Sequence, residues 1–373
     1  MKILIVGAGA SGIVAAINYK RNHPKDDVLV IEHLNEPLKK LLATGNGRCN
    51  LANTNIDISR YSNSDFVKNI LKEYDYKKLC DSISLKTRVI DDLVYPYSES
   101  AVSVRNALLN EARKQKVSIK LEEKLIDYKV ADQIEVITNK GKYKVNRLYL
   151  ATSLLSGNKL GSDGSILSIL KKHNYKIKNP LPGLCPIVTK EDTKLLDGTR
   201  IKCEVKLYEN KKQIHSEKGE VLFKKNGLSG IVIFNVSSLI ARGSKNNVKI
   251  YLDLLPDIAF ENLENDCKSR TNEEIVNSYF NPKISRYLLA RFHDKNDLLD
   301  CIKNLEFSFK DFYDFIYSQV SVGGVDISMV DNSLQSKHEK GVYLLGELLD
   351  IDGPCGGYNL TWSFASAIHA TKI

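Results

Sequence analysis

The sequence predicts an α/β protein with a parallel-sheet pattern near both ends of the chain and a different pattern between them. The first 32 residues follow the pattern strand, helix, strand, and residues 341–361 follow the pattern strand, glycine-rich turn, helix. Between them, a proline-containing linker at 179–186 precedes a β-rich and then a helical stretch. At 373 residues, with 43% apolar and 27% charged side chains, the composition is that of a globular protein of two or three domains.

Glycine is distributed unevenly along the chain. Of the 22 glycines, five lie between Gly7 and Gly47 and seven between Gly323 and Gly357, whereas 48–140 and 244–322 contain none. Because glycine lets a backbone approach another group closely, this distribution predicts such close approaches in two distant segments of the chain.

Hydrophobic periodicity places the elements of the first part of the chain. We expect strands over residues 2–6, 28–32, 117–128, 133–138 and 143–151, and helices over 11–21, about 63–82 and about 98–115, with a Gly/Asn-rich loop at 43–55.

The middle of the chain has a different pattern, and the parallel-sheet pattern returns after it. Strands are expected at Ile201–Tyr208, Gln213–Lys218, Glu220–Phe223, Ile231–Phe234 and Val248–Leu252, helices over 260–317, and further strands at Ser321–Asp326 and Gly341–Leu345. The linker at 179–186 and the return of strand signals at Ser321 mark the two ends of this middle stretch.

The segment Gly7–Gly12 has the spacing G-x-G-x-x-G between the first strand and the first helix. In such a turn the first glycine permits the bend, the second lets the backbone approach a pyrophosphate, and the third lets the helix pack on the strand. Glu32, at the end of the next strand, is placed to accept hydrogen bonds from both ribose hydroxyls and would repel a 2′-phosphate. The sequence therefore predicts a site for FAD or NAD rather than NADP.

The second glycine cluster, Gly346–Leu360, decides between these two cofactors. A strand ends at Gly346-Glu347, and a helix begins near Tyr358. FAD is long enough for its ribityl chain and flavin ring to reach a second strand end, where a carboxylate suits ribityl hydroxyls and a helix N-terminus stabilises reduced flavin. An NAD-binding domain has no need of this second element, so we expect FAD.

Several motifs give the chain a resemblance to a known family. Besides the fingerprint, the sequence contains the segments Lys39–Asn50, Tyr95-Pro96, Gly227–Gly230, Gly323–Val325 and Gly346–Trp362. With these, it resembles the FAD-dependent flavoproteins called BaiN-like or aminoacetone oxidase-like. The resemblance implies a discontinuous Rossmann-like FAD-binding domain of the glutathione reductase type, with an inserted β-barrel-like domain and a small helical domain. The expected bounds are 1–185 and 318–373 for the two parts of the FAD-binding domain, 186–256 for the β-rich insert and 257–317 for the helical domain.

The resemblance and the two clusters together name the residues expected at the cofactor. Arg48 is expected to face a phosphate or the pyrimidine edge of the flavin. No catalytic residue is assigned, and no metal site is expected. The expected cofactor-binding residues are Gly7, Gly9, Ala10, Ser11, Gly12, Glu32, His33, Lys40, Thr44, Gly45, Gly47, Arg48, Cys49, Asn50, Thr152, Gly346, Glu347, Asp350, Gly357, Tyr358, Asn359 and Leu360.

The chain departs from the family pattern at two places. In the family, the strand that ends in Ala-Thr is usually followed by paired glycines, whereas here Ala151-Thr152 is followed by Ser153-Leu154 in a shorter loop. Cys355 stands where the family often has threonine. Cys49 and Cys355 are interpreted as small buried residues rather than as a redox pair, since no C-x-x-C spacing is present.

These observations support the hypothesis of an FAD-dependent oxidoreductase that acts on a small organic substrate by flavin-mediated hydride transfer. It would be either an NAD(P)H-dependent reductase, with NAD(P)H as a transient electron donor, or an oxygen-using oxidase. The alternative is a flavin-containing RNA-binding or RNA-modifying protein, because the net charge is +9. The basic residues are dispersed, however, and no aromatic residues interleave with basic clusters along the chain, so no nucleic-acid partner is expected.

Cysteine usage and hydropathy indicate the compartment. The seven cysteines form no pattern typical of disulfides or zinc, and no apolar run reaches the length of a membrane span. We therefore expect a cytoplasmic protein without a membrane anchor. The sequence does not indicate an oligomeric state.

Overall fold

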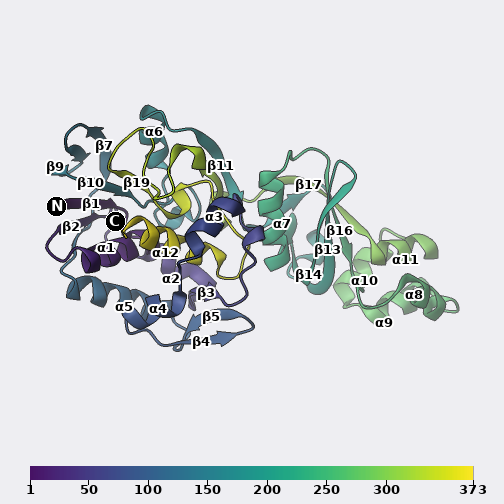
Figure 1. The fold of residues 1–373 in the computed structure, drawn as a ribbon. Helices are drawn as coiled ribbons and strands as arrows, with labels where there is room; N and C mark the ends of the chain where they lie inside the picture. Colours follow the sequence, from purple (N-terminus) through teal and green to yellow (C-terminus); the bar gives the residue numbers. More distant parts are fainter. Residues whose placement is uncertain (373) are drawn as a thin grey trace. The chain divides into compact units, whose positions relative to one another are not determined.

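The computed structural model describes residues 1–372. Contacts divide the chain into two compact units, Met1–Leu181 with Val320–Ile373, and Pro182–Gln319 (Figure 1). The first unit thus contains both ends of the chain, as the sequence predicts. The changeovers fall at 181/182 and 319/320, a few residues from the expected 185/186 and 317/318.

A parallel five-stranded sheet forms the centre of the first unit. Its order is β19-β10-β1-β2-β6, and every neighbouring pair is parallel. These strands are β1 (Lys2–Val6), β2 (Asp27–Ile31), β6 (Ser118–Lys120), β10 (Arg147–Leu150) and β19 (Val342–Leu344). Val6 and Leu150 are paired in register, so the ends of β1 and β10 lie side by side. The expected strand 117–128 is two strands in the structure, because only its first residues join this sheet.

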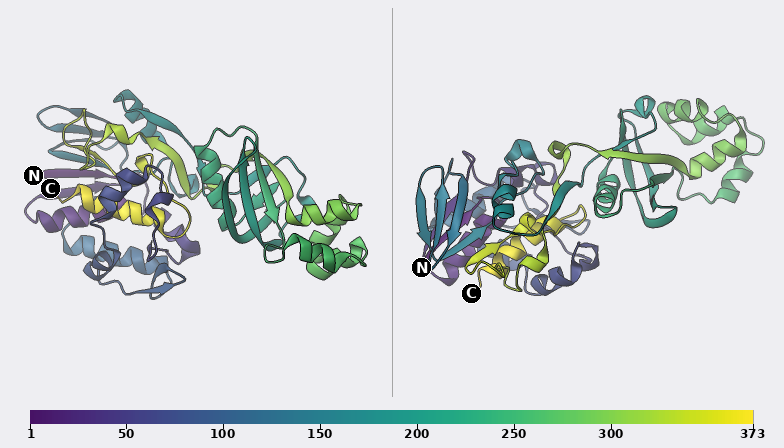
Figure 2. Two further views of the ribbon diagram at one scale, coloured as in Figure 1. Left: turned by 45° about the vertical axis from the view of Figure 1, so that its right-hand side comes forward. Right: turned by 90° about the horizontal axis from the view of Figure 1, so that it is seen from above.

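Helices cover one side of the sheet, and a small antiparallel sheet covers the other (Figures 1 and 2). The helices are α1 (Ala10–Asn22), α5 (Ala101–Lys114) and α12 (Tyr358–Ala370), and the antiparallel strands are β7 (Leu125–Val130), β8 (Ile134–Thr138) and β9 (Lys142–Val145). Both layers contribute to one hydrophobic core, in which Trp362 is the largest fully buried side chain.

Shorter elements connect these layers. The expected helix at 63–82 is two helices, and the expected linker at 179–186 begins inside a strand, β11, that pairs with β18. The remaining elements of this unit are α2 (Lys39–Ala43), β3 (Ala52–Asn53), α3 (Ser64–Leu71), α4 (Tyr76–Ser82), β4 (Thr87–Ile90), β5 (Leu93–Pro96), α6 (Ser165–Lys172), β11 (Ile177–Gly183) and β18 (Val320–Val325), with short 3-10 turns at Ile58–Arg60, Thr44–Gly47, Asn158–Leu160, Ile327–Met329 and Gly346–Leu348.

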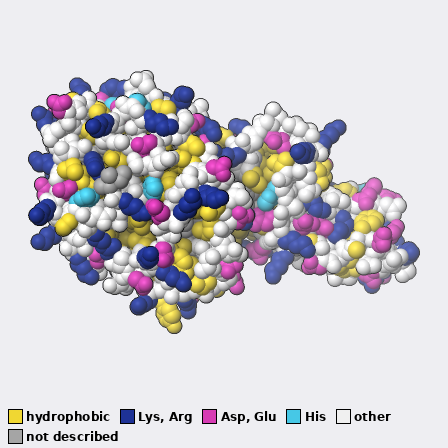
Figure 3. Space-filling view, viewed as in Figure 1, with side chains coloured by type: hydrophobic (Ala, Val, Ile, Leu, Met, Phe, Trp, Pro, Cys, Tyr) yellow, Lys and Arg dark blue, Asp and Glu magenta, His cyan; other side chains and the backbone are white. Residues whose placement is uncertain are grey.

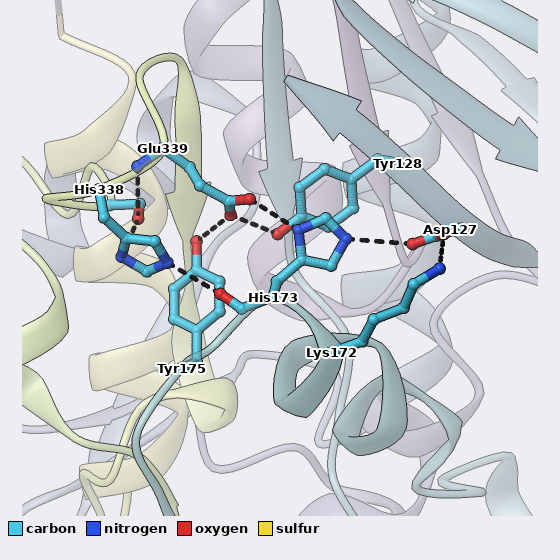
Figure 4. A network of polar contacts seen from close by, with 8 residues as sticks. Asp127, Tyr128, Lys172, His173, Tyr175, His338 and Glu339 are labelled. Carbon is cyan, nitrogen blue, oxygen red and sulfur yellow. Dashed lines mark hydrogen bonds and ion pairs between the residues drawn. The ribbon is translucent and has the colours of Figure 1, made fainter. Parts of the chain in front are cut away.

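A polar network ties the antiparallel sheet to the segment that precedes β19 (Figure 4). His173 lies between two carboxylates, with Nδ1 2.6 Å from Glu339 Oε1 and Nε2 3.0 Å from Asp127 Oδ1. The hydroxyls of Tyr128 and Tyr175 both donate to Glu339 Oε2, at 2.6 and 2.8 Å. Because the residues come from β7, the end of α6 and the loop before β19, the network fixes three separate segments of the first unit.

The second unit is a closed six-stranded barrel with helices. The strand order is β12-β15-β14-β13-β16-β17, and β17 closes the barrel against β12. Its elements are β12 (Ile187–Thr189), β13 (Arg200–Glu209), β14 (Lys212–Lys224), β15 (Gly227–Ser229), α7 (Ile231–Arg242), β16 (Val248–Asp253), α8 (Phe260–Cys267), α9 (Asn272–Tyr279), α10 (Pro282–Leu289), α11 (Lys295–Lys303) and β17 (Leu305–Phe312), with 3-10 turns at Lys194–Leu196 and Phe315–Tyr317.

Two predictions for this unit are wrong. Ile231–Phe234, expected as a strand, begins α7, because Val232, Val236 and Ile240 continue the apolar pattern at helical spacing and are buried against the barrel. The expected helical stretch to 317 ends at Lys303, and β17 follows, with Leu305 and Phe307 buried. Barrel and helices also share one hydrophobic cluster.

Candidate functional site

The carboxyl ends of three neighbouring parallel strands bring the two glycine-rich segments together. β1 leads into Gly7, β10 into Thr152 shortly after its end, and β19 into Gly346. A Cβ atom placed on Gly346 would lie 3.0 Å from Ser11 Oγ, so the second glycine cluster passes directly beside the first turn of α1. Ligands of parallel α/β sheets bind at this edge.

The surroundings of the three fingerprint glycines explain in different ways why a side chain is absent at each position. A Cβ on Gly7 would lie 2.7 Å from Ala151 O, and a Cβ on Gly12 would lie 1.9 Å from Gly7 O, so neighbouring backbone excludes side chains at both positions. A Cβ on Gly9 would meet nothing within 4 Å, and its φ of −78° suits any residue. The fold itself therefore does not require glycine at position 9. The space beside Gly9 is open, and a side chain at this position would exclude a ligand from that space.

Polar groups without protein partners surround that space. Gly9 caps α1 without a side-chain hydrogen bond, and Ala10 begins the helix, so no side-chain oxygen caps the N–H groups of its first turn. The Oγ1 atom of Thr152 is buried without a hydrogen-bond partner. Free N–H groups at a helix N-terminus and a hydroxyl are the donors that a pyrophosphate requires.

Glu32 lies at the end of β2 and is buried. Its carboxylate accepts hydrogen bonds from Ala8 N at 2.8 Å and Leu34 N at 3.0 Å, and Oε1 lies 2.9 Å from His33 Nδ1. Burial raises the pKa of Glu32, but the hydrogen bonds from His33, Leu34 and Ala8 outweigh it and hold the pKa below its ordinary value. The Glu32 partner in turn raises the pKa of His33. The carboxylate is thus fixed and ionised beside the fingerprint.

A second polar cluster surrounds Glu347. Its Oε2 atom lies 2.6 Å from Lys40 Nζ, and its Oε1 atom accepts from Ser321 N at 2.8 Å and from the Ser156 hydroxyl. Burial raises the pKa of Glu347, but the Lys40 charge and the hydrogen bonds from Lys40, Ser156 and Ser321 lower it overall. The cluster therefore carries a carboxylate that can accept from hydroxyls and an ammonium that can donate to hydroxyl or phosphate oxygens.

The loop Thr44–Asn50 has a backbone conformation that few residue types adopt readily. Gly45, Asn46, Gly47 and Cys49 all have positive φ angles, of 56°, 54°, 83° and 60°. The Asn50 amide, oriented so that both of its atoms are satisfied, donates to Ala52 O at 2.8 Å and accepts from Gly357 N at 3.1 Å. This loop is therefore joined to the second glycine cluster through a side-chain bridge.

Two residues of this loop have surroundings that bear on their expected roles. The Arg48 guanidinium lies 4.8 Å from the centre of the Tyr95 ring and 3.6 Å from Glu99, and its side chain is 46% exposed. Burial raises the pKa of the Cys49 thiol to about 11, which keeps it protonated. Cys49 is thus a buried packing residue, while Arg48 contacts protein groups rather than the fingerprint.

Four of the expected cofactor-binding residues after Gly346 have side chains that contact other groups of the protein. The Asp350 carboxylate is buried and lies 2.7 Å from Lys178 Nζ. The Tyr358 hydroxyl accepts from Asp57 N at 3.1 Å, and the Asn359 amide accepts from Gly353 N at 3.0 Å and donates to Gly353 O at 2.8 Å. Leu360 is half-buried against the core. These side chains shape the loop 353–357 and the start of α12.

The structure also adds residues that sequence reasoning missed. Ser156 and Ser321 contact Glu347, although Ser156 lies in the loop that departs from the family pattern. The only signal in the sequence was its position shortly after Thr152. The pocket beside the fingerprint is lined, among others, by Gly7, Ala8, Gly9, Glu32, His33, Leu34, Glu36, Lys40, Lys124, Thr152, Ser153, Ser162 and Asp163.

Solved structures with a similar fold define the class of protein. A 3-ketosteroid delta1-dehydrogenase from Sterolibacterium denitrificans aligns over 99% of both chains with a TM-score of 0.52 at 10% identity. A quinol-fumarate reductase aligns over 100% of this chain and 70% of its own with a TM-score of 0.51 at 12% identity. These likenesses define the fold class, a mixed α/β fold with a Rossmann-type FAD-binding domain.

Within this class, the chain belongs to the HI0933-like family, because the family model "HI0933-like protein Rossmann domain" matches residues 1–373. A 3-dehydro-bile acid delta(4,6)-reductase of Clostridium scindens is 32% identical over 100% of this chain and 98% of that protein. Ribosomal RNA dihydrouridine synthases of Haemophilus influenzae and Escherichia coli are 24% and 23% identical over 98% of this chain and 96% and 95% of theirs. Within residues 1–372, no helix combines the length and apolar character that a membrane span requires.

Proposed function

We propose that the chain binds FAD across its two glycine clusters and reduces a carbon–carbon double bond conjugated to a carbonyl group in a small organic molecule, with NAD(P)H as electron donor. The observation that carries the proposal is the open space beside Gly9, which is bordered by uncapped N–H groups and by the unpartnered Thr152 hydroxyl. A pyrophosphate fits both the space and its donors.

Each part of the site has a role in this proposal. Glu32, fixed by three hydrogen bonds, accepts from the adenosine ribose hydroxyls, and the start of α1 binds the pyrophosphate. Glu347 and Lys40 bind ribityl hydroxyls and a phosphate oxygen. The start of α12, whose N-cap Gly357 makes no side-chain cap, stabilises negative charge at the flavin. When bound, FAD supplies hydride transfer.

The proposed substrate class rests on the chemistry shared by the named relatives. A delta(4,6)-reductase of a 3-dehydro substrate acts on double bonds conjugated to a ketone. A dihydrouridine is a uridine whose double bond, conjugated to a ring carbonyl, has been reduced. Both products need a hydride and a proton added across such a bond. The relative with the higher identity acts on a small molecule, which favours a small substrate for this chain.

The test begins with the visible spectrum of the purified protein, followed by anaerobic mixing with NADH and NADPH. The proposal expects a flavin spectrum that bleaches with one of the two and recovers when a 3-oxo-Δ4 steroid or a simple cyclic enone is added. A protein that neither retains nor rebinds FAD contradicts the proposal. Bleaching by an amine substrate, with recovery only in oxygen, would instead identify an oxidase.

A second candidate function is the reduction of uridine in RNA. It is favoured by the two ribosomal RNA dihydrouridine synthases, which match this chain over nearly its whole length. The visible face of the molecule carries Lys and Arg side chains in dispersed positions rather than in one continuous field (Figure 3). Incubation of the reduced protein with ribosomal RNA, followed by mass spectrometry of the nucleosides, discriminates the two candidates, because only the second yields dihydrouridine.

A further inference from the structure

Two neighbouring strands of the barrel, β13 and β16, carry tyrosines and lysines that alternate across the strand pair. In the antiparallel register, Lys206 stands opposite Tyr251, and Tyr208 stands opposite Lys249. The residues between them point into the barrel and are buried: Val205, Leu207, Ile250 and Leu252. Because successive side chains of a strand point to opposite faces, the two tyrosines and two lysines lie together on the outer face.

A groove forms at this part of the outer face. It has a volume of about 510 Å³ and is lined by Tyr208, Lys211, Asn247, Lys249, Tyr251 and Asn304. The rings of Tyr208 and Tyr251 lie 5.1 Å apart between centres and are inclined by 76°. Lys211, Asn247 and Asn304 lie in or beside the turns that border β13, β16 and β17. The two aromatic rings are thus bordered by ammonium and amide groups, and by the Glu306 carboxylate at the Tyr251 hydroxyl.

Acidic side chains near the groove form hydrogen bonds and ion pairs with neighbouring residues of the barrel. Glu306 accepts from the Tyr251 hydroxyl at 2.7 Å, and its other oxygen lies 2.7 Å from Lys249 Nζ. Glu204 lies 3.8 Å from Lys206 Nζ and accepts from the Ser216 hydroxyl. These contacts hold Tyr251 and Lys249 in place. Lys211 lies at the tip of the β13–β14 turn, so its charge adds to the basic side of the groove.

We propose that this outer face of the barrel binds single-stranded RNA, with bases stacked on Tyr208 and Tyr251. Lys211 contacts a phosphate directly, and Lys206 and Lys249 contact phosphates in exchange for their Glu204 and Glu306 partners. Aromatic rings on adjacent strands, bordered by lysines, are the combination that proteins use to bind unpaired bases and their backbone. The amides of Asn247 and Asn304 offer hydrogen bonds to a 2′-hydroxyl. The proposal goes beyond the reaction proposed above and uses residues of the second unit alone.

The experiment measures the fluorescence anisotropy of a labelled oligouridylate of about 12 nucleotides, at ~50 mM salt, with the full-length protein carrying its FAD. We expect saturable binding that the double variant Tyr208→Ala/Tyr251→Ala weakens at least about tenfold. The variant Tyr208→Phe/Tyr251→Phe keeps both rings and is expected to bind within about threefold of wild type. Tyr317→Ala, an exposed tyrosine of the same unit outside the groove, is the matched control and is expected to change nothing.

Charge is tested separately by the salt dependence. Lys249→Ala should reduce the slope of log K against log salt concentration by about 0.7, as expected for one lost phosphate contact on a single strand. Three results would overturn the proposal: no binding at low salt, wild-type affinity of the double alanine variant, or equal affinity for an abasic strand. Equal affinity for oligodeoxyuridylate would overturn the assignment to RNA. None of these readouts requires catalytic activity, so they are independent of the proposed reaction.

Discussion

The two glycine clusters differ in how their polar groups are used. In the fingerprint, no side chain caps the N–H groups at the start of α1, and Thr152 Oγ1, which lines the same pocket, has no hydrogen-bond partner. In the second cluster, Asp350 pairs with Lys178, the Tyr358 hydroxyl bonds to Asp57 N, and the Asn359 amide bonds to Gly353 within the cluster itself. The first cluster therefore offers its backbone to a ligand, whereas the second mainly uses its side chains to build the loop that holds the ligand. Glu347 is the member of the second cluster that is placed for both tasks.

The largest expected effect tests whether packing alone requires glycine in the fingerprint. Gly12→Ala places a Cβ about 2 Å from Gly7 O, so the helix and the strand must separate. We expect the free energy of unfolding to fall by about 3 kcal/mol, measured by urea denaturation without added FAD. A fall of less than about 0.5 kcal/mol would show that the contact between α1 and β1 is not tight.

The next effect concerns the ion pair of the second cluster. Glu347→Gln leaves the Lys40 ammonium without its carboxylate, and we expect a loss of about 2 kcal/mol at pH 7. Because the folded-state pKa of Glu347 is lowered, its contribution is present above the unfolded-state pKa and is lost as the pH falls through the folded-state value.

Urea melts of wild type and Glu347→Gln should therefore converge in acid. The double variant Lys40→Met/Glu347→Gln is the control, since it removes both charges and should recover part of the lost stability. A difference between wild type and Glu347→Gln that stays constant down to strongly acidic pH would contradict the ion-pair explanation.

A smaller effect separates ligand binding from folding at Gly9. Gly9→Ser adds a side chain into open space at the N-cap of α1, where serine is favoured, so stability should change by less than about 0.5 kcal/mol. FAD retention should nevertheless weaken at least about tenfold, because the new side chain occupies the space proposed for the pyrophosphate. Equilibrium dialysis with FAD measures the effect, and unchanged affinity would remove the main support for the proposed site.

The smallest effect is expected at Arg48. Its side chain is 46% exposed and its partner Glu99 is 3.6 Å away, so Arg48→Ala should change stability by less than about 0.5 kcal/mol. We expect a weaker effect on FAD affinity than that of Gly9→Ser, measured by the same dialysis. An equal or larger effect would show that Arg48 leaves Tyr95 to contact the cofactor, as the family resemblance implies.

The fingerprint was predictable because its function depends on backbone geometry that glycine spacing reports directly. Gly7 and Gly12 are in close contact with backbone, and Glu32 stands at the end of β2 where the spacing places it. The contacts of Glu347 were not predictable to the same extent. They depend on Lys40, Ser156 and Ser321, which are far apart in sequence and meet only when the strands are assembled.

The elements and the surface of the barrel were still harder to predict from the sequence. The apolar run at Ile231 fits a strand or a helix over four residues, and only the longer pattern to Ile240 identifies α7. Lysine and tyrosine alternate at Lys206 and Tyr208 and again at Lys249 and Tyr251, about 40 residues apart, and only the register of β13 and β16 brings the two pairs together on one face. Such a surface exists between strands and is invisible in a linear pattern.

The pairing of β16 with β17 has a consequence for how the second unit tolerates change. Leu252 pairs with Leu305, so the chain leaves the barrel at one point and re-enters it at the neighbouring strand after four helices. The helices occupy the position of a hairpin turn, and Leu254 N still bonds to Ile302 O at 2.9 Å across their base. The order of the strands therefore does not depend on how long this stretch is. Because its helices share a hydrophobic cluster with the barrel, a segment that replaced them would have to bury the same apolar surface.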